Sequence, residues 1–253
     1  MKMSVKDVKS SVFLAFIILL LLFTICLVLY SKWNKKDIDV TTNISFDGGT
    51  DSLSQELQYI IPFVTTNNKQ YVTAYQKDYV TLNQVHNDIL LTKGYFHHQE
   101  NVFSSGILIS SLNNLYGSEA FIVNKNFNVN GKNNCIYDNN VYSCTLEDYN
   151  GILYKADRDI VNVNINDNKL SLIENILFYS EETIQGVTYY RIYNNGLYET
   201  NTLTITSNDL KKANVSFDNY ISNNLSDSRV TYQSDFVINE NNYNWIGTGI
   251  IWK

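Results

Sequence analysis

Hydrophobic residues follow three patterns along this chain: first an unbroken run, then helical spacing, then strict alternation. The unbroken run covers residues 12 to 30, "VFLAFIILLLLFTICLVLY", and contains no charged residue. At 1.5 Å per residue, a helix of this length reaches about 28 Å, close to the roughly 30 Å hydrocarbon thickness of a bilayer. The run therefore predicts a transmembrane helix, with the lipid bilayer as its partner.

The flanking residues favour a retained anchor over a cleaved signal peptide. A signal peptide has a shorter apolar core followed by small residues, whereas Tyr30-Ser31-Lys32-Trp33 follows here. Three lysines precede the run and three follow it, so lysine counts do not decide the orientation. The tail of residues 1 to 11 is too short for a domain. We expect a single-pass protein of the cell membrane with a cytoplasmic N-terminus and an extracellular C-terminal domain.

Helical spacing of apolar residues begins after a polar segment. Residues 31 to 51 are mostly polar, which predicts a stalk. A first helix should begin at Ser52, because Gln55 three residues later completes a capping box. It should end before Pro62, since the residue before a proline avoids the helical conformation.

Two more segments carry the same helical signals. Thr81 and Gln84 form a second capping box, and Lys93-Gly94 predicts the end of that helix. A third helix is expected from Ser104 to Tyr116, with Gly117 as its terminator.

Alternating apolar and polar residues dominate the rest of the chain. In "IVNVNIND", Val161, Val163 and Ile165 alternate with asparagine, the two-residue period of a half-buried strand. Helices followed by strands predict an α+β fold, with two or three helices packed on a curved antiparallel sheet. We expect one extracytoplasmic domain over residues 52 to 253, with helices at about 52–116 and the sheet at about 118–252.

Two of the three cysteines lie in "NNCIYDNNVYSC". A two-residue turn at Asn139-Asn140 suits a type I′ hairpin and places Cys135 opposite Cys144. Their Cα atoms would be about 4.5 Å apart, within the range that a disulfide accepts. The same register pairs Tyr137 with Tyr142. We expect a disulfide; free thiols or a metal or redox site are the alternatives.

The histidines are the first candidates for chemistry. His97, His98 and Glu100 lie close in sequence and could ligate a metal, but adjacent loop histidines lack the spacing of a helical zinc motif. His86 is expected on the second helix, away from them. Solvated side chains are the better interpretation, and no metal site is predicted.

Two acidic segments offer oxygen ligands for calcium. Asp157-Arg158-Asp159 is interpreted as a surface ion-pair cluster, and Asn166-Asp167-Asn168 as a turn between strands. Neither has the glycine and terminal glutamate of an EF-hand loop. Serine-nucleophile, P-loop and Rossmann motifs are also absent from the sequence. We therefore predict no catalytic, metal-binding or cofactor-binding residue and expect no cofactor.

A group of aromatic residues is the candidate ligand surface. Tyr189, Tyr193, Tyr198 and Trp245 could line a concavity for a sugar or a peptide, although core packing also explains such residues.

Charge excludes one class of partner. Residues 1 to 36 carry six lysines and one aspartate, a net charge of +5, so the formal −6 of the chain leaves −11 for residues 37 to 253. An acidic domain repels the phosphate backbone, so nucleic acid is not expected as a partner.

Several segments also carry a resemblance. They are "LSQELQYI", "AYQKDYVTLNQVHNDIL", "NLYG", the two-cysteine hairpin, "KLSLIENILFY", "YYRIYN" and "YNWIGTGII". Their order resembles single-pass membrane proteins of AT-rich Gram-positive bacteria, to which no activity is assigned. The order of helices and sheet is similar to the cystatin-like or NTF2-like class, whose concave sheet often holds a ligand or partner. The resemblance implies no catalytic residue.

These observations favour a membrane-anchored extracytoplasmic binding or scaffold domain over an enzyme. Its expected partner is an envelope protein or a surface ligand. The alternatives are a surface hydrolase with active-site residues dispersed in the sequence, or a subunit of an envelope assembly.

Overall fold

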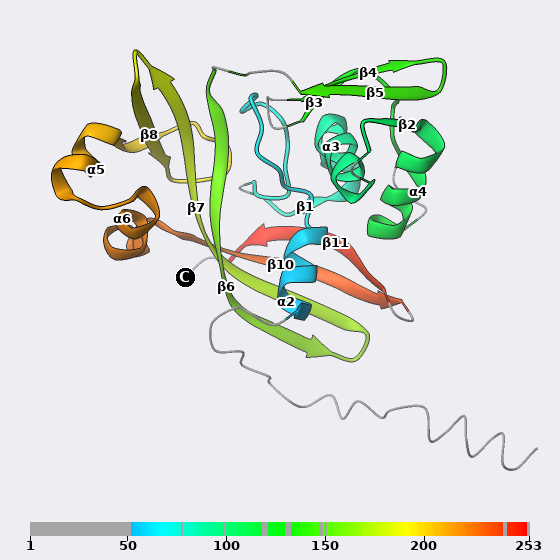
Figure 1. Ribbon diagram of the computed structural model, residues 1–253. Helices are drawn as coiled ribbons and strands as arrows, with labels where there is room; N and C mark the ends of the chain where they lie inside the picture. The colour runs from blue at the N-terminus through cyan, green and yellow to red at the C-terminus, as the bar shows by residue number, and fades with distance from the viewer. Residues whose placement is uncertain are drawn as a thin grey trace, which may run out of the picture. The chain divides into compact units, whose positions relative to one another are not determined.

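The computed structural model describes residues 52–76, 78–98, 100–117, 121–129, 133–146, 149, 151–239 and 242–251 (Figure 1). The predicted transmembrane run, the N-terminal tail and the stalk lie outside these residues. Within the described ranges, no helix is long and apolar enough to cross a membrane. The described residues have an α+β fold with antiparallel sheets, as the sequence predicts.

The larger sheet has the strand order β1-β11-β10-β7-β8-β9, with β6 paired to β7. Its strands are β1 (Val80–Thr81), β6 (Leu153–Asn166), β7 (Lys169–Ile184), β8 (Val187–Tyr193), β9 (Asn201–Thr206), β10 (Val230–Asn239) and β11 (Asn242–Ile250). Strand β7 pairs with β6 along one edge. Its other edge pairs with β10 over residues 169–176 and with β8 over residues 178–184. Strand β7 therefore joins two parts of the sheet, one that contains β10, β11 and β1 and one that contains β8 and β9.

A smaller sheet has the order β2-β5-β4-β3. Its strands are β2 (Val102–Ser104), β3 (Phe127–Val129), β4 (Asn133–Asp138) and β5 (Val141–Leu146). The helices are α2 (Ser52–Ile60), α3 (Asn87–His98), α4 (Ser105–Tyr116), α5 (Ser207–Ala213) and α6 (Phe217–Asn224). Helices α3 and α4 contact each other, and α5 contacts β8 and β9 (Figure 1). The second sheet was not expected from the sequence.

The hairpin prediction is confirmed in its turn, its register and its disulfide, although the two cysteine Cα atoms lie closer together than the expected distance of about 4.5 Å. Asn139 and Asn140 both have positive φ angles, of 48° and 64°. Cys135 pairs with Cys144, and their side chains form a disulfide with the Cα atoms 4.0 Å apart. Tyr137 and Tyr142 pair as expected, with ring centroids 4.9 Å apart. The two asparagines of the turn thus adopt the conformation that this register requires.

The first and third helix predictions are confirmed. Helix α2 begins at Ser52 and ends at Ile60, just before Pro62. Helix α4 begins after Ser104, whose hydroxyl accepts a hydrogen bond from the Ile107 amide, and ends before Gly117.

The prediction for the second helix is wrong at both ends. Thr81 and Gln84 do form a capping box, but it caps a short 3₁₀ turn, Leu82–Gln84. Helix α3 begins at Asn87 and continues through Gly94 to His98. Gly94 faces α4, where a Cβ atom would lie 3.0 Å from Leu108 Cγ and Leu112 Cγ. The glycine permits close packing of two helices instead of ending one.

Two further differences concern the second half of the chain. Helices α5 and α6 fall within the region where only strands were expected. The alternation in "IVNVNIND" is interrupted by a bulge between Ile160 and Asn162 on β6. Val163 is buried as predicted, whereas Val161, the extra residue of the bulge, is exposed.

Candidate functional site

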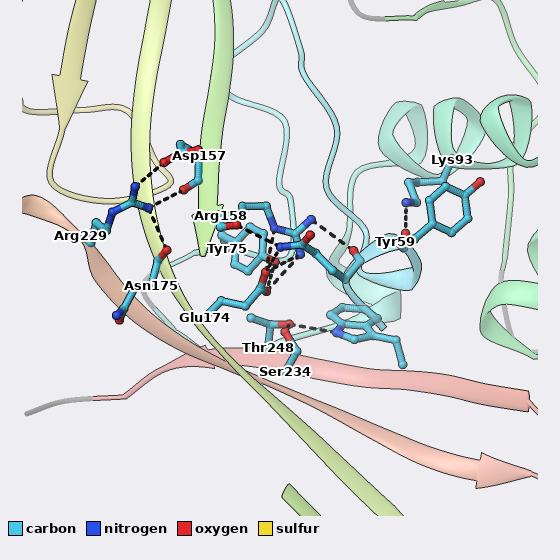
Figure 2. Close-up of polar contacts among 12 residues, drawn as sticks. Tyr59, Tyr75, Lys93, Asp157, Arg158, Glu174, Asn175, Arg229, Ser234 and Thr248 are labelled. Carbon is cyan, nitrogen blue, oxygen red and sulfur yellow. Dashed lines mark hydrogen bonds and ion pairs between the residues drawn. The ribbon is translucent and has the colours of Figure 1, made fainter. Parts of the chain in front are cut away.

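The candidate site begins with a buried ion pair between neighbouring strands. Arg158 lies on β6 and Glu174 on β7; the Glu174 side chain is buried, and the Arg158 side chain is largely buried, with 14% of its surface exposed. Arg158 Nε donates to Glu174 Oε1 and Arg158 Nη2 to Glu174 Oε2, each at 3.1 Å (Figure 2). This two-bond geometry is the strongest that the two groups can form.

Two further residues complete the bonding of Glu174. Tyr75 donates a hydrogen bond of 2.6 Å to Oε2, and Gln58 Nε2 donates one of 2.7 Å to Oε1. The Arg158 guanidinium also lies 5.0 Å from the centroid of the Tyr75 ring. Burial raises the pKa of Tyr75 well above its usual value, so its hydroxyl stays a donor. A buried charge pair with full bonding of this kind meets the condition for tolerating charge in a core.

The end of helix α2 is held by two cations. Arg158 Nη1 donates to the carbonyl of Gln58 at 3.2 Å, and Lys93 Nζ donates to the carbonyl of Tyr59 (Figure 2). The last carbonyls of a helix lack partners within the helix and carry a partial negative charge. The two cations therefore satisfy these carbonyls and fix the end of α2 against α3 and β6.

Lys93 differs from Arg158 because the described part of the chain supplies no counter-ion for it. Its side chain is buried, and its Nζ lies 4.2 Å from the centroid of the Tyr59 ring. Among the described residues, no carboxylate lies within ion-pair distance of Lys93 Nζ. Burial, together with the nearby charge of Arg158, lowers the pKa of Lys93 to about 7.

A pocket of about 350 Å³ opens at these two cations. It is lined by Gln55, Gln58, Tyr59, Phe63, Val64, Thr65, Lys93, Phe96 and Arg158. The aromatic and aliphatic side chains supply an apolar wall, and the cations with the glutamines and Thr65 supply polar atoms. The exposed lining is somewhat more polar than apolar, so polar groups form a larger share of it than in most small-molecule sites. Because Glu174 neutralises Arg158, the charge left over at this pocket is the ammonium of Lys93.

The three histidines do not come together. His86 precedes α3, its ring stacks on Tyr71 at 4.1 Å, and its Nδ1 accepts from the amide of Asp88. Burial lowers the pKa of His86. His98 Nε2 lies 3.2 Å from Glu100, while His97 is exposed. Both lie at the end of α3, which corrects the prediction of a loop. No group of three or more potential metal ligands occurs among the described residues.

The acidic segment Asp157-Arg158-Asp159 is only partly a surface cluster, which corrects its interpretation. The two aspartates pair with Arg229, the second with an O–N distance of 3.1 Å. Arg158 points away from Asp157, to the opposite face of the strand (Figure 2). The turn at Asp167 is confirmed: it joins β6 to β7 and has a positive φ of 55°.

The four candidate ligand-surface aromatics are divided between two places. Tyr193 and Tyr198 are buried, with ring centroids 5.4 Å apart, and Tyr198 donates to the carbonyl of Lys155. Tyr189 lies on β8, near the Arg191 guanidinium. Trp245 is buried on β11, where it lines a second pocket, of about 660 Å³. Core packing, the alternative interpretation, describes Tyr193 and Tyr198.

The residues of the cationic pocket were missed in the sequence, although a signal for them exists. Lys93 lies four residues after Ile89, on the apolar face of its helix. Glu174 takes the place of an apolar residue in the alternation between Leu172 and Ile176. A charged residue at a core position predicts a buried charge and a partner for it.

Comparison with known proteins gives no further information about this pocket. No family model, curated protein or solved structure matches the chain.

Proposed function

We propose that this protein is a membrane-anchored extracytoplasmic domain that binds a small ligand in the pocket at the end of α2, without chemistry of its own. The observation that carries the proposal is the buried Lys93 ammonium, which lines the pocket and has no carboxylate within ion-pair distance among the described residues. Burying a charge without a partner lowers the stability of a protein. Such groups occur frequently at binding and catalytic sites.

The proposed location rests on two features. The apolar run of residues 12 to 30 is long enough to span a bilayer. The Cys135–Cys144 disulfide suits an oxidising compartment outside the cytoplasm. A curved sheet like that of cystatin-like or NTF2-like domains remains part of this proposal, because such sheets often hold a ligand.

The alternative of a surface hydrolase would need a histidine and acids gathered in one pocket. The described pocket at Lys93 is lined by neither a histidine nor a carboxylate. A subunit of an envelope assembly is the second candidate. Exposed Val102, Ile136 and Val141 on the smaller sheet favour it, since exposed apolar side chains on one sheet suit a protein partner.

The location is tested by labelling whole Gram-positive cells that express the intact chain with a membrane-impermeant thiol reagent. We expect Cys135 and Cys144 to be labelled only after reduction of the cells. Labelling that requires lysis but no reduction would place the domain in the cytoplasm and contradict the proposal.

The binding function is tested with the full-length protein in detergent. A library of small fragments is screened by ligand-observed NMR against wild type and the Lys93→Met variant. We expect fragments that bind wild type and lose binding in the variant. The proposal is wrong if no fragment distinguishes the two proteins while circular dichroism shows both folded.

A further inference from the structure

We infer that the pocket at the end of α2 holds a small carboxylate with an apolar body, whose oxygens form an ion pair with Lys93 Nζ. The inference rests on the proposed function, because it names the class of ligand for the same pocket. Its basis is the charge and the shape of the described pocket.

The charge argument concerns the hydrogen-bonding capacity of Lys93. An ammonium has three donors, and Lys93 uses one of them on the Tyr59 carbonyl. A carbonyl and an aromatic face are weaker partners for a buried ammonium than a carboxylate is. The Arg158 charge is already neutralised by Glu174 through two hydrogen bonds. An entering carboxylate would thus neutralise Lys93, the pocket cation that has no anionic partner among the residues that the structure describes.

The shape argument concerns the body of the ligand. Tyr59, Phe63 and Phe96 line the pocket beside the cations, and Val64 extends this apolar wall. Burial of a ring or a short alkyl chain against such side chains contributes favourable free energy in proportion to the area removed from water. A volume of about 350 Å³ is at the small end of ligand pockets, which suits a compact ligand. Benzoate combines a carboxylate and an apolar ring in one small molecule.

Binding of a carboxylate should be coupled to a proton. The groups around Lys93 are Tyr59 from α2, Arg158 from β6 with Glu174 behind it, and His97 one turn further along α3. Because burial and the nearby charge of Arg158 lower the pKa of Lys93 to about 7, the Lys93 ammonium of the free pocket loses its charge as the pH rises above 7. A bound carboxylate raises this pKa again. Affinity should therefore be constant below pH 7 and fall up to about tenfold per pH unit above it.

The test compares benzoate with its neutral counterpart benzamide by isothermal titration calorimetry on the full-length protein in detergent. Titrations at pH 6, 7, 8 and 9 are compared. We expect benzoate to bind at least about tenfold more tightly than benzamide at pH 6, and the difference to shrink by pH 9. Equal affinities at pH 6, or a benzoate affinity that does not change with pH, would overturn the inference.

Variants test whether the preference for benzoate over benzamide depends on Lys93. Lys93→Met should abolish the preference for benzoate and its pH dependence. His97→Gln and Lys155→Met should leave both unchanged, since one removes the nearby histidine and the other a lysine that pairs with Glu181 outside the pocket. The pH profile of wild type needs no variant, so a misfolded Lys93→Met protein does not remove the test.

The outcomes also separate this inference from the function on which it rests. In one outcome, fragments bind wild type and not Lys93→Met while benzoate binds no more tightly than benzamide. This outcome would support the binding function and contradict the inference that the ligand is a carboxylate. Failure of both benzoate and the fragment library would contradict both.

Discussion

Gly94 on α3 lies directly against Leu112 on α4, so that a Cβ atom at position 94 would come within 3.0 Å of Leu112 Cγ. Leu108 and Leu112 are both fully buried, so neither can move aside without disturbing the core. This contact explains why a helix continues through a glycine that, in sequence, resembles a terminator.

Replacement of Gly94 by alanine should destabilise the protein by about 1–2 kcal/mol, because overpacking outweighs the gain in helix propensity. Gly106→Ala on α4 is the matched control, since the nearest atom to its new Cβ lies 3.7 Å away and the site is exposed. The control should be neutral or slightly stabilising. Urea unfolding of both variants measures the difference, and equal stabilities would contradict the packing argument.

Loss of the Glu174 charge should lower the free energy of unfolding far more than loss of the half-buried Glu181 charge. Glu174→Gln leaves the largely buried Arg158 without its counter-ion, for which we expect a loss of about 3–5 kcal/mol in the free energy of unfolding. Glu181→Gln breaks the 2.5 Å pair with Lys155, which is more accessible to solvent, and should cost about 0–1 kcal/mol. Thermal unfolding followed by circular dichroism ranks the two variants. A small effect of Glu174→Gln would mean that Arg158 is stabilised by other contacts.

Lys93 should make the stability depend on pH. Above pH 7 the folded protein has lost the proton of Lys93, whereas the unfolded chain keeps it up to its ordinary pKa. The unfolded state then binds more protons, so the free energy of unfolding should rise with pH, by at most about 1.4 kcal/mol per unit. Chemical denaturation at pH 7, 8 and 9 tests this, with Lys155→Met as a control. The rise should vanish in Lys93→Met; a rise of the same size there would assign it to another group.

Reduction of the disulfide should have a moderate effect. Because the bond between Cys135 and Cys144 closes a short loop, its removal should lower stability by about 2–3 kcal/mol without preventing folding. The double variant Cys135→Ser/Cys144→Ser, compared with wild type by hydrogen exchange of β4 and β5, measures the loss. Complete unfolding of the variant would show that the bond supports more than the hairpin.

Local signals in the sequence predicted local structure well. The Asn139-Asn140 turn determines its hairpin register within a few residues, and Ser52 and Ser104 mark where α2 and α4 start. These features depend on backbone preferences and on contacts between near neighbours, which a single sequence contains.

Features that depend on distant contacts were not predicted. Lys93 and Arg158 meet only because α3 and β6 both pack against the end of α2, and nothing in the spacing of their segments shows this. Gly94 was misread for the same reason, since its partner helix lies elsewhere in the sequence. The sequence did contain two signals of buried charge, namely Lys93 on the apolar face of its helix and Glu174 at an apolar position of its strand.

Strand β7 has a consequence for how the protein unfolds. Phe178 contributes to the larger hydrophobic core, and its neighbour Leu177 contributes to the smaller core beneath α5 and α6. The two cores therefore lie back to back on one strand and share its backbone. Loss of either would expose the reverse side of the other, so heating should give a single cooperative transition instead of two separate ones.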